Sequence, residues 1–178
     1  MKRFILPLLL FHFICKSYSQ VPEELWSVTY PEPDTTYIHT EKMICDVEGN
    51  TYLTGYINEN NNKDFITIKY NSNGIKLWTA TYNSSYDSTD QATDIAVDAS
   101  GNVYVTGRSI DGGSPNDYLT IKYNSEGVVQ WTVRFNGSGS NEYFSNIYLA
   151  LDSQGNVFIT GTNWGNATQV WNYVTVKY

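Results

Sequence analysis

The chain has 178 residues, of which 41% are hydrophobic and 16% charged, and its formal net charge is −7. This balance provides enough apolar mass for a folded core and excludes a disordered chain, while the negative charge argues against binding to nucleic acid or to an anionic membrane surface. The 15 Tyr, 5 Trp and 7 Phe residues, together with 13 Gly, favour strands joined by tight turns over helices. We therefore predict an all-β protein.

Residues 1–19 have the layout of a secretory signal peptide. A basic start at residues 1–3 is followed by an apolar run at residues 4–15 and by a polar end that contains the small residues Ser17 and Ser19. The apolar run is too short to span a bilayer comfortably. We predict cleavage before Gln20 and a mature chain, residues 20–178, that is secreted to the exterior or cell surface, or to the periplasm, without a membrane span. A buried N-terminal strand or an uncleaved anchor is the alternative.

Cleavage also changes the charge and the cysteine count. It removes Lys2, Arg3 and Lys16, which leaves 8 basic against 18 acidic residues and a net charge of −10. Only Cys45 remains of the two cysteines, so an intrachain disulfide is impossible. We interpret Cys45 as a small core residue.

The mature chain contains three copies of a two-part pattern. The first part reads CDVEGNTYLTG from Cys45, VDASGNVYVTG from Val97 and LDSQGNVFITG from Leu151. The second part reads DFITIKYNSNGIKLW from Asp64, DYLTIKYNSEGVVQW from Asp117 and NYVTVKY from Asn172. Trp26, Trp78 and Trp131 recur at spacings of 52 and 53 residues. A period of about 53 residues is typical of propeller-blade repeats.

Each copy predicts four short antiparallel strands. In the second copy these are residues 95–97, 103–106, 118–123 and 128–135, and tight turns join the first pair and the last pair. The three blade units are then predicted at approximately 42–82, 94–135 and 147–178, with the last unit lacking its fourth strand. Residues 25–30 match a fourth strand but precede the first unit, so they predict an orphan outer strand and twelve strands in all.

The motifs Asp-x-x-Gly-Asn-x-[Tyr/Phe]-x-Thr-Gly and Tyr-Asn-Ser-x-Gly-x-x-x-Trp resemble the bacterial β-propeller repeat called the SBBP repeat, over residues 26–178. The resemblance implies an exported bacterial protein, often one with further domains or sorting signals. Such propellers are thought to close with about seven blades. Three tandem four-stranded blades would then be an incomplete propeller, whose bare outer faces need further blades of a longer gene product, a partner chain or a strongly bent assembly. We favour the first of these.

The repeated polar turns are interpreted as hairpin caps. Asp46, Asp98 and Asp152 stand in turns too short to wrap a cation, and they lack the ligand spacing and later Glu of a calcium loop. We therefore predict no metal and no cofactor. The repeat residues given a structural role are Asp46, Gly49, Asn50, Gly55, Asp98, Gly101, Asn102, Gly107, Asp152, Gly155, Asn156, Gly161, Trp26, Trp78 and Trp131.

No catalytic residues are predicted. The mature chain has one histidine, His39, interpreted as a loop residue, and it has no nucleophile elbow and no phosphate-binding glycine loop. The Gly-x-x-x-Trp spacing is also found in quinone-dependent propeller dehydrogenases, but no cofactor ligands can be identified here.

Function is predicted on the loops that differ between copies, because a propeller carries ligands on loops over a rigid scaffold. Two sets of loops share one face: residues 31–41, 83–93 and 136–146, and residues 56–63, 108–116 and 162–171. The side chains there that suit a protein or carbohydrate ligand are Tyr37, Tyr86, Arg108, Asp111, Tyr143, Trp164 and Trp171. The alternative is that these aromatic residues pack the blade edges. We predict an exported non-catalytic binding or scaffolding module; the alternative is a fragment of a secreted propeller enzyme acting on polysaccharide.

The two ends of the repeat region are not expected to meet. Three blades that turn by about 51° each sweep less than half a circle. We therefore predict that residues 26–30 do not pair with residues 173–178 of the same molecule, and either remain unpaired or pair with the third blade of another molecule.

Overall fold

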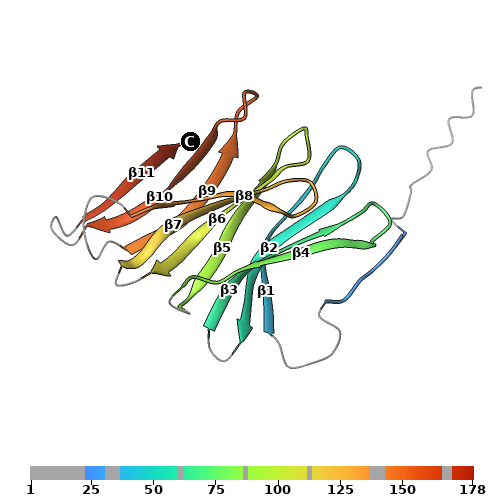
Figure 1. Cartoon of the computed structure of the whole chain (residues 1–178), viewed down its shortest axis with the longest axis horizontal. Helices are drawn as coiled ribbons and strands as arrows, with labels where there is room; N and C mark the ends of the chain where they lie inside the picture. The colour runs from blue at the N-terminus through green and yellow to red at the C-terminus, as the bar shows by residue number, and fades with distance from the viewer. Residues whose placement is uncertain are drawn as a thin grey trace, which may run out of the picture.

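The computed structural model describes residues 23–30, 37–59, 62–85, 88–111, 114–136, 143–165 and 170–178. Within these ranges all regular secondary structure is β-strand, which confirms the all-β prediction. The eleven strands of the described residues form three antiparallel sheets, two of four strands and one of three (Figure 1). The first sheet contains β1 (Tyr37–Cys45), β2 (Thr51–Glu59), β3 (Asn62–Tyr70) and β4 (Lys76–Tyr82). The second contains β5 (Asp90–Val97), β6 (Val103–Asp111), β7 (Ser114–Tyr123) and β8 (Val129–Phe135), and the third contains β9 (Tyr143–Leu151), β10 (Val157–Gly165) and β11 (Val170–Lys177).

Each sheet is a meander in which neighbours in sequence are neighbours in space. The first and second strands are joined by the Asp-x-x-Gly-Asn turn, and the third and fourth by the Asn-Ser-x-Gly turn. Both turns need a residue with positive φ, which glycine adopts without steric cost. Gly101 and Gly127 supply it in the second sheet, with φ of 78° and 81°. The repeat therefore encodes its hairpins through these turns.

The three sheets stand in a row, face against face, with the first strand of each lying close to the neighbouring sheet (Figure 1). Two hydrophobic cores fill the spaces between them. Alternation along β6 divides its side chains between these cores, because successive residues of a strand point to opposite faces. Val103 and Val105 enter the core shared with the first sheet, and Tyr104 enters the core shared with the third.

Every sheet thus has a forward face, toward the next sheet, and a backward face, toward the preceding one. The forward face is rich in aromatic residues, such as Tyr52 and Phe65 of the first sheet. The backward face is mainly aliphatic, as with Leu119 and Ile121 of the second sheet. Burial of each such side chain contributes about 1.5–3 kcal/mol, so the stacking of sheets is the main source of stability.

The strands are longer than the sequence predicts. The sheets span residues 37–82, 90–135 and 143–177, so each begins ahead of the predicted units at 42, 94 and 147. The predicted loops at 56–63, 108–116 and 162–171 are largely strand as well, and His39 lies within β1. These strand ends were not predicted because their composition is polar. Backbone pairing with a neighbouring strand, rather than side-chain hydrophobicity, keeps them extended.

The predicted outer strand at residues 25–30 is not formed, so the described chain has eleven strands in place of twelve. Residues 23–29 have no regular secondary structure. We predicted that they would not pair with residues 173–178 of the same molecule, and they do not. Trp26 lies instead against Gly74 of the first sheet. A strand needs a ladder partner, and β3 is already paired with β4. Cys45 is also not a core residue, because it is exposed at the end of β1.

Helices of membrane-spanning length and hydropathy do not occur in the described residues.

Candidate functional site

The Asp-x-x-Gly-Asn turns hold their aspartates in closed hydrogen-bond networks. In the second sheet Asp98 Oδ1 accepts from the backbone N–H groups of Ser100 and Asn102, both at 2.9 Å. Asp98 Oδ2 accepts from Asn102 Nδ2 at 2.8 Å and from the Tyr104 hydroxyl at 3.1 Å. Burial opposes ionisation of Asp98, but these hydrogen bonds outweigh it and hold the pKa of the carboxyl below its usual value. The same caps recur at Asp46 and Asp152.

Two clefts lie between these turns. One of about 610 Å³ separates the Asp46 turn from the Asp98 turn, and one of about 500 Å³ separates the Asp98 turn from the Asp152 turn. The aspartates that line both clefts already accept hydrogen bonds from their own turns. Among the described residues no three His, Cys, Asp or Glu side chains gather in a way that could hold a metal ion. The geometry of the turns therefore serves hairpin capping.

A further contact ties the first sheet to the second. Trp78 of β4 and Lys69 of β3 both donate to the carbonyl oxygen of Ser125, at 3.1 Å and 3.4 Å. Ser125 belongs to the β7–β8 turn of the following sheet, and the Trp78 ring covers Gly127 in that turn. We call this arrangement the Trp–Lys–Ser tie. The sequence shows its tryptophans as a repeat but does not show that they reach across to the neighbouring sheet.

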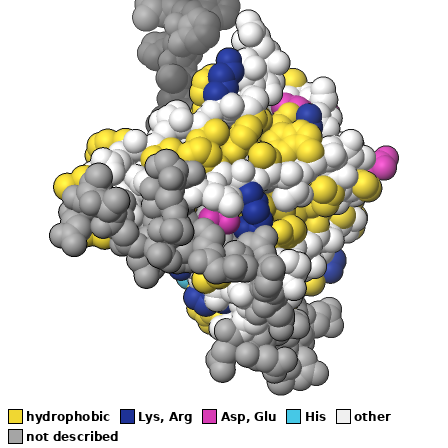
Figure 2. Space-filling model, turned by 60° about the vertical axis from the view of Figure 1, so that its left-hand side comes forward, with side chains coloured by type: hydrophobic (Ala, Val, Ile, Leu, Met, Phe, Trp, Pro, Cys, Tyr) yellow, Lys and Arg dark blue, Asp and Glu magenta, His cyan; other side chains and the backbone are white. Residues whose placement is uncertain are grey.

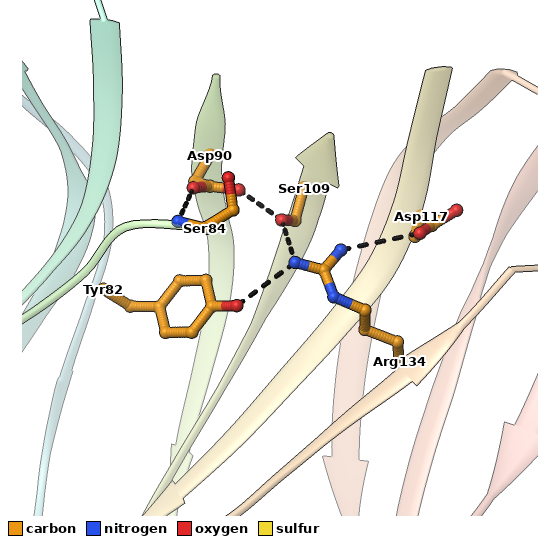
Figure 3. Close-up of polar contacts among 6 residues, drawn as sticks. All are labelled: Tyr82, Ser84, Asp90, Ser109, Asp117 and Arg134. Atoms are coloured by element: carbon orange, nitrogen blue, oxygen red, sulfur yellow. Dashed lines mark hydrogen bonds and ion pairs between the residues drawn. The ribbon is translucent and has the colours of Figure 1, made fainter. Parts of the chain in front are cut away.

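A buried polar cluster joins the first and second sheets (Figure 3). Asp90 accepts from the backbone N–H of Ser84 at 2.7 Å and from the hydroxyl of Ser109. Arg134 Nη2 donates to Ser109 Oγ at 2.8 Å and to the Tyr82 hydroxyl at 3.1 Å. Arg134 Nη1 also lies 3.5 Å from Asp117 Oδ2. The guanidinium thus contacts Asp117 directly and Asp90 through the Ser109 hydroxyl, and it connects both with Tyr82 of the first sheet.

Sequence reasoning missed this cluster, and the register shows why. Asp90 pairs with Ser109 across β5 and β6 at the end of the sheet that the sequence assigned to a loop. Both side chains are fully buried. Nothing in the repeat pattern signals them, because the corresponding positions in the first sheet are Ile38 and Ile57. The only available signal was the presence of polar residues where another copy has aliphatic ones.

Burial raises the pKa of Asp90, outweighing the hydrogen bonds from Ser109 and Ser84 and the charge of Arg134. Because the folded-state pKa lies above the ordinary value of 3.8, this carboxyl favours folding at low pH, and that contribution is lost as pH rises through the folded-state pKa. We therefore expect the wild type to lose stability relative to Asp90→Asn as pH rises from the ordinary carboxyl pKa through the raised folded-state pKa. Urea denaturation of both proteins at several pH values measures the difference.

Asp98→Asn is the matched control for that experiment. Because the pKa of Asp98 is lowered, its contribution to folding is present at neutral pH and is lost as pH falls through the folded-state value. Relative to this variant, the wild type should lose stability with acidification, the opposite direction to Asp90. Parallel pH profiles for the wild type and Asp90→Asn would contradict the assignment.

The opposite end of the sheets, where β2 joins β3, β6 joins β7 and β10 joins β11, carries exposed aromatic rings. We call it the loop end. In the first sheet the rings of Tyr37, His39 and Tyr56 gather, with centroids 5.0 Å apart for His39 and Tyr56 and 6.4 Å for Tyr37 and His39. Lys63 Nζ lies 4.4 Å from the Tyr56 centroid. In the third sheet Trp164 and Trp171 meet edge to face, with centroids 5.4 Å apart.

The predicted ligand-binding residues are distributed unevenly over this end. The structure brings together Trp164 and Trp171, and it places Tyr37 beside His39 and Tyr56, two residues that we did not predict. Arg108 and Asp111 lie within β6, and Tyr143 begins β9. Tyr86 lies outside the described residues. His39 and Tyr56 could have been found by extending the strands, because they face each other across β1 and β2.

Stacked antiparallel meanders of three or four strands with a recurring turn motif are typical of propeller-type repeats. Residues 78–113 match the family model of the SBBP beta-propeller repeat, which confirms the resemblance read from the sequence. The matched segment begins at Trp78 of the Trp–Lys–Ser tie and includes the Asp98 turn. No curated protein matches the chain.

Proposed function

We propose that this protein is an exported, non-catalytic β-propeller module that binds a carbohydrate at its loop end. The observation that carries the proposal is the exposure of aromatic rings there: Trp171 is 58% exposed and Tyr37 is 59% exposed, although each lies against another ring. Flat rings with a polar atom at one edge suit the mixed apolar and hydroxyl surface of a sugar. A protein ligand would use the same rings as anchors, and it is the alternative outcome of the binding test.

The scaffold supports this role by holding the rings rigidly. Trp164 and Trp171 are register partners across β10 and β11, and His39 and Tyr56 are register partners across β1 and β2. Strand pairing fixes the backbone of these residues, and the contacts between the rings restrict their side chains, which lowers the entropic cost of binding. In the first sheet Lys63 adds a cation to the aromatic group, where its ammonium lies over the Tyr56 ring.

Trp171→Ala should weaken binding to a soluble polysaccharide at least about tenfold, because a central aromatic anchor contributes about 1–2 kcal/mol or more. The measurement is affinity electrophoresis of the exported chain in gels containing a soluble β-glucan or a soluble α-glucan. Val47→Ala is the matched control, because Val47 is fully exposed in the β1–β2 turn at the other end of the sheet. Equal retardation of all three proteins by every polysaccharide would contradict the carbohydrate proposal.

The enzymatic alternative is that the chain is a piece of a secreted propeller enzyme acting on polysaccharide. An assay for reducing sugar in the same samples distinguishes it from the binding module. Release of reducing sugar from a retarding polysaccharide would favour that alternative. Binding without release supports the binding module.

Export and assembly complete the proposal. Export rests on the signal-like residues 1–19, and the exported protein should begin at Gln20 when its N-terminus is sequenced. Assembly rests on the forward face of the third sheet, where Tyr148 is 59% and Tyr173 88% exposed. In this proposal the three sheets are part of a propeller of about seven blades, or of another closed ring, and further blades or a partner chain cover that face.

A further inference from the structure

The first sheet accepts the tryptophan contacts of a Trp–Lys–Ser tie without the lysine contact. Trp26 Nε1 donates to the carbonyl oxygen of Ser72 at 3.1 Å, and the Trp26 ring covers Gly74. Trp78 makes the same two contacts with Ser125 and Gly127. In the complete tie a lysine from the third strand of the preceding sheet also donates to the serine carbonyl. Among the described residues no lysine donates to Ser72.

The missing lysine has a counterpart in the third sheet. Lys177 lies over the Phe158 ring, with Nζ 5.2 Å from the centroid, as Lys69 lies over the Tyr52 ring at 5.1 Å. The described residues place no strand beside the outer edge of β11, which carries Lys177. The third sheet therefore presents the lysine of a tie but not its tryptophan.

The sequences of the two halves agree with this reading. Residues 26–30 read Trp-Ser-Val-Thr-Tyr and residues 78–82 of β4 read Trp-Thr-Ala-Thr-Tyr. Residues 173–177 of β11 read Tyr-Val-Thr-Val-Lys and residues 65–69 of β3 read Phe-Ile-Thr-Ile-Lys. Residues 26–30 are thus the counterpart of a fourth strand, and β11 is the counterpart of the third strand that would pair with it.

These halves lie at opposite ends of the row of sheets, so they cannot meet within one molecule (Figure 1). The faces that accompany them are complementary. On the backward face of the first sheet Ile66 and Ile68 are already buried, beside a cavity of about 210 Å³ that Val28 and Tyr30 also line. The same face leaves Met43 58% exposed, opposite Leu53 across β1 and β2. The third sheet presents an aromatic forward face with Tyr148 and Tyr173. Figure 2 shows exposed hydrophobic side chains gathered on the side of the molecule that comes forward with the third sheet.

We propose that two copies of this chain associate head to tail, with the aromatic face of each third sheet packed on the aliphatic face of the other copy's first sheet. Residues 26–30 of one copy become the fourth strand beside β11 of the other. The β3–β4 register then transfers directly: Lys177 pairs with Trp26 of the partner, and Tyr173 pairs with Tyr30 of the partner. Lys177 also donates to the Ser72 carbonyl of the partner, which completes the tie.

The geometry of such a pair allows closure. The three described sheets of each copy give six in a pair, a number inside the range of about four to eight blades that propellers close with. In such a ring the end faces of the described sheets are covered in both copies, which makes it a closed arrangement and not an open filament. The inference rests on the proposed covering of the end faces and is independent of the ligand at the loop end.

Sedimentation of the exported chain tests it first, and the expected mass is that of two copies. Lys177→Glu should weaken the dimer at least tenfold, because it places a carboxylate against the Ser72 carbonyl. Lys177 is exposed, so circular dichroism should show an unchanged fold. Gln130→Glu is the control, because Gln130 is exposed on β8, away from both end faces, and should leave the dimer intact.

Cysteine pairing tests the register. In chains whose Cys45 is replaced by alanine, Ser27→Cys and Val176→Cys are made separately, since these positions correspond to the Thr79–Ile68 pair of β4 and β3. Mixed under oxidising conditions, the two variants should form an interchain disulfide that neither forms alone. A dimer without this disulfide would overturn the inference.

A monomer in sedimentation would also overturn the inference. Binding of a dye that is fluorescent on apolar surfaces then tests separately whether the third-sheet face is bare and needs further blades or a partner chain to cover it. Dye binding that Tyr173→Ser abolishes would leave a bare third-sheet face for other blades to cover. A monomer that binds no dye would contradict both proposals.

Discussion

Gly107→Ala is expected to reduce the free energy of unfolding by about 3–5 kcal/mol, among the largest effects of any single substitution in this chain. A methyl group on Gly107 would overlap the carbonyl oxygen of Gln91 and would lie 2.6 Å from the Cα atom of Ala92. Both obstacles are backbone atoms of β5, at the irregularity between Ala92 and Asp94, so the sheet itself must separate to admit the methyl group. Urea denaturation followed by circular dichroism measures the loss.

Gly155→Ala is the matched control. Gly155 has a φ of 82°, so alanine there is strained, but no atom lies within 4 Å of the added methyl group. The expected cost is about 1–2 kcal/mol from the left-handed backbone alone. If the two variants were equally stable, the close approach of β5 to β6 would not be a feature of the folded protein.

Trp78→Ala is expected to cost about 3 kcal/mol, at the lower end for a large aromatic residue because Trp78 is only half-buried. The substitution removes the hydrogen bond to Ser125, the cover over Gly127 and a ring contact with Tyr123 at 6.1 Å. All three partners belong to the second sheet, so the loss falls on the contact between sheets. Chemical denaturation of the variant gives the magnitude.

Trp131→Ala provides the comparison, because Trp131 occupies in the second sheet the position that Trp78 occupies in the first. It packs edge to face on Tyr104 of its own sheet, with centroids 6.0 Å apart. In the described part of the chain its Nε1 makes no tie to a following turn. The cost should be lower than for Trp78→Ala by about 1 kcal/mol, the value of one hydrogen bond and its packing. An equal or larger cost would mean that the tryptophans act within their own sheets.

The repeat pattern predicts the centre of each sheet well, for a physical reason. The turns at Asp98 and at Asn124 fix both hairpins locally, through side-chain caps and a glycine with positive φ. Strand pairing then follows from the turns, because a tight turn sets the register of its hairpin. These interactions are short in sequence, and short-range signals can be read from residue types alone.

The ends of the sheets and the contacts between them could not be predicted in the same way. Gln91 and Arg108 read as loop residues, yet the ladder pairs them. The cluster of Asp90, Ser109 and Arg134 depends on partners far apart in the chain, and no repeat marks it. Residues 25–30 have the sequence of a strand but lack a free neighbour, so composition alone gave the wrong secondary structure.

The candidate site was predicted in part for a related reason. Aromatic residue type indicated Trp164, Trp171 and Tyr37, because large rings near strand ends are conspicuous in any sequence. Their grouping with His39 and Tyr56 depends on strand register, which the predicted loops obscured.

The central claim is that the first sheet is fastened to the second through Trp78, which covers the glycine turn at Gly127. Nuclear Overhauser effects from the indole protons of Trp78 to the Hα protons of Gly127 test it most directly, with those from Trp26 to Gly74 measured in the same spectra. Both sets of cross-peaks are expected, together with ring-current shifts of the glycine Hα protons, because each ring lies against its glycine. Absence of the cross-peaks between Trp78 and Gly127 in the folded protein would contradict the stacking of the first sheet on the second.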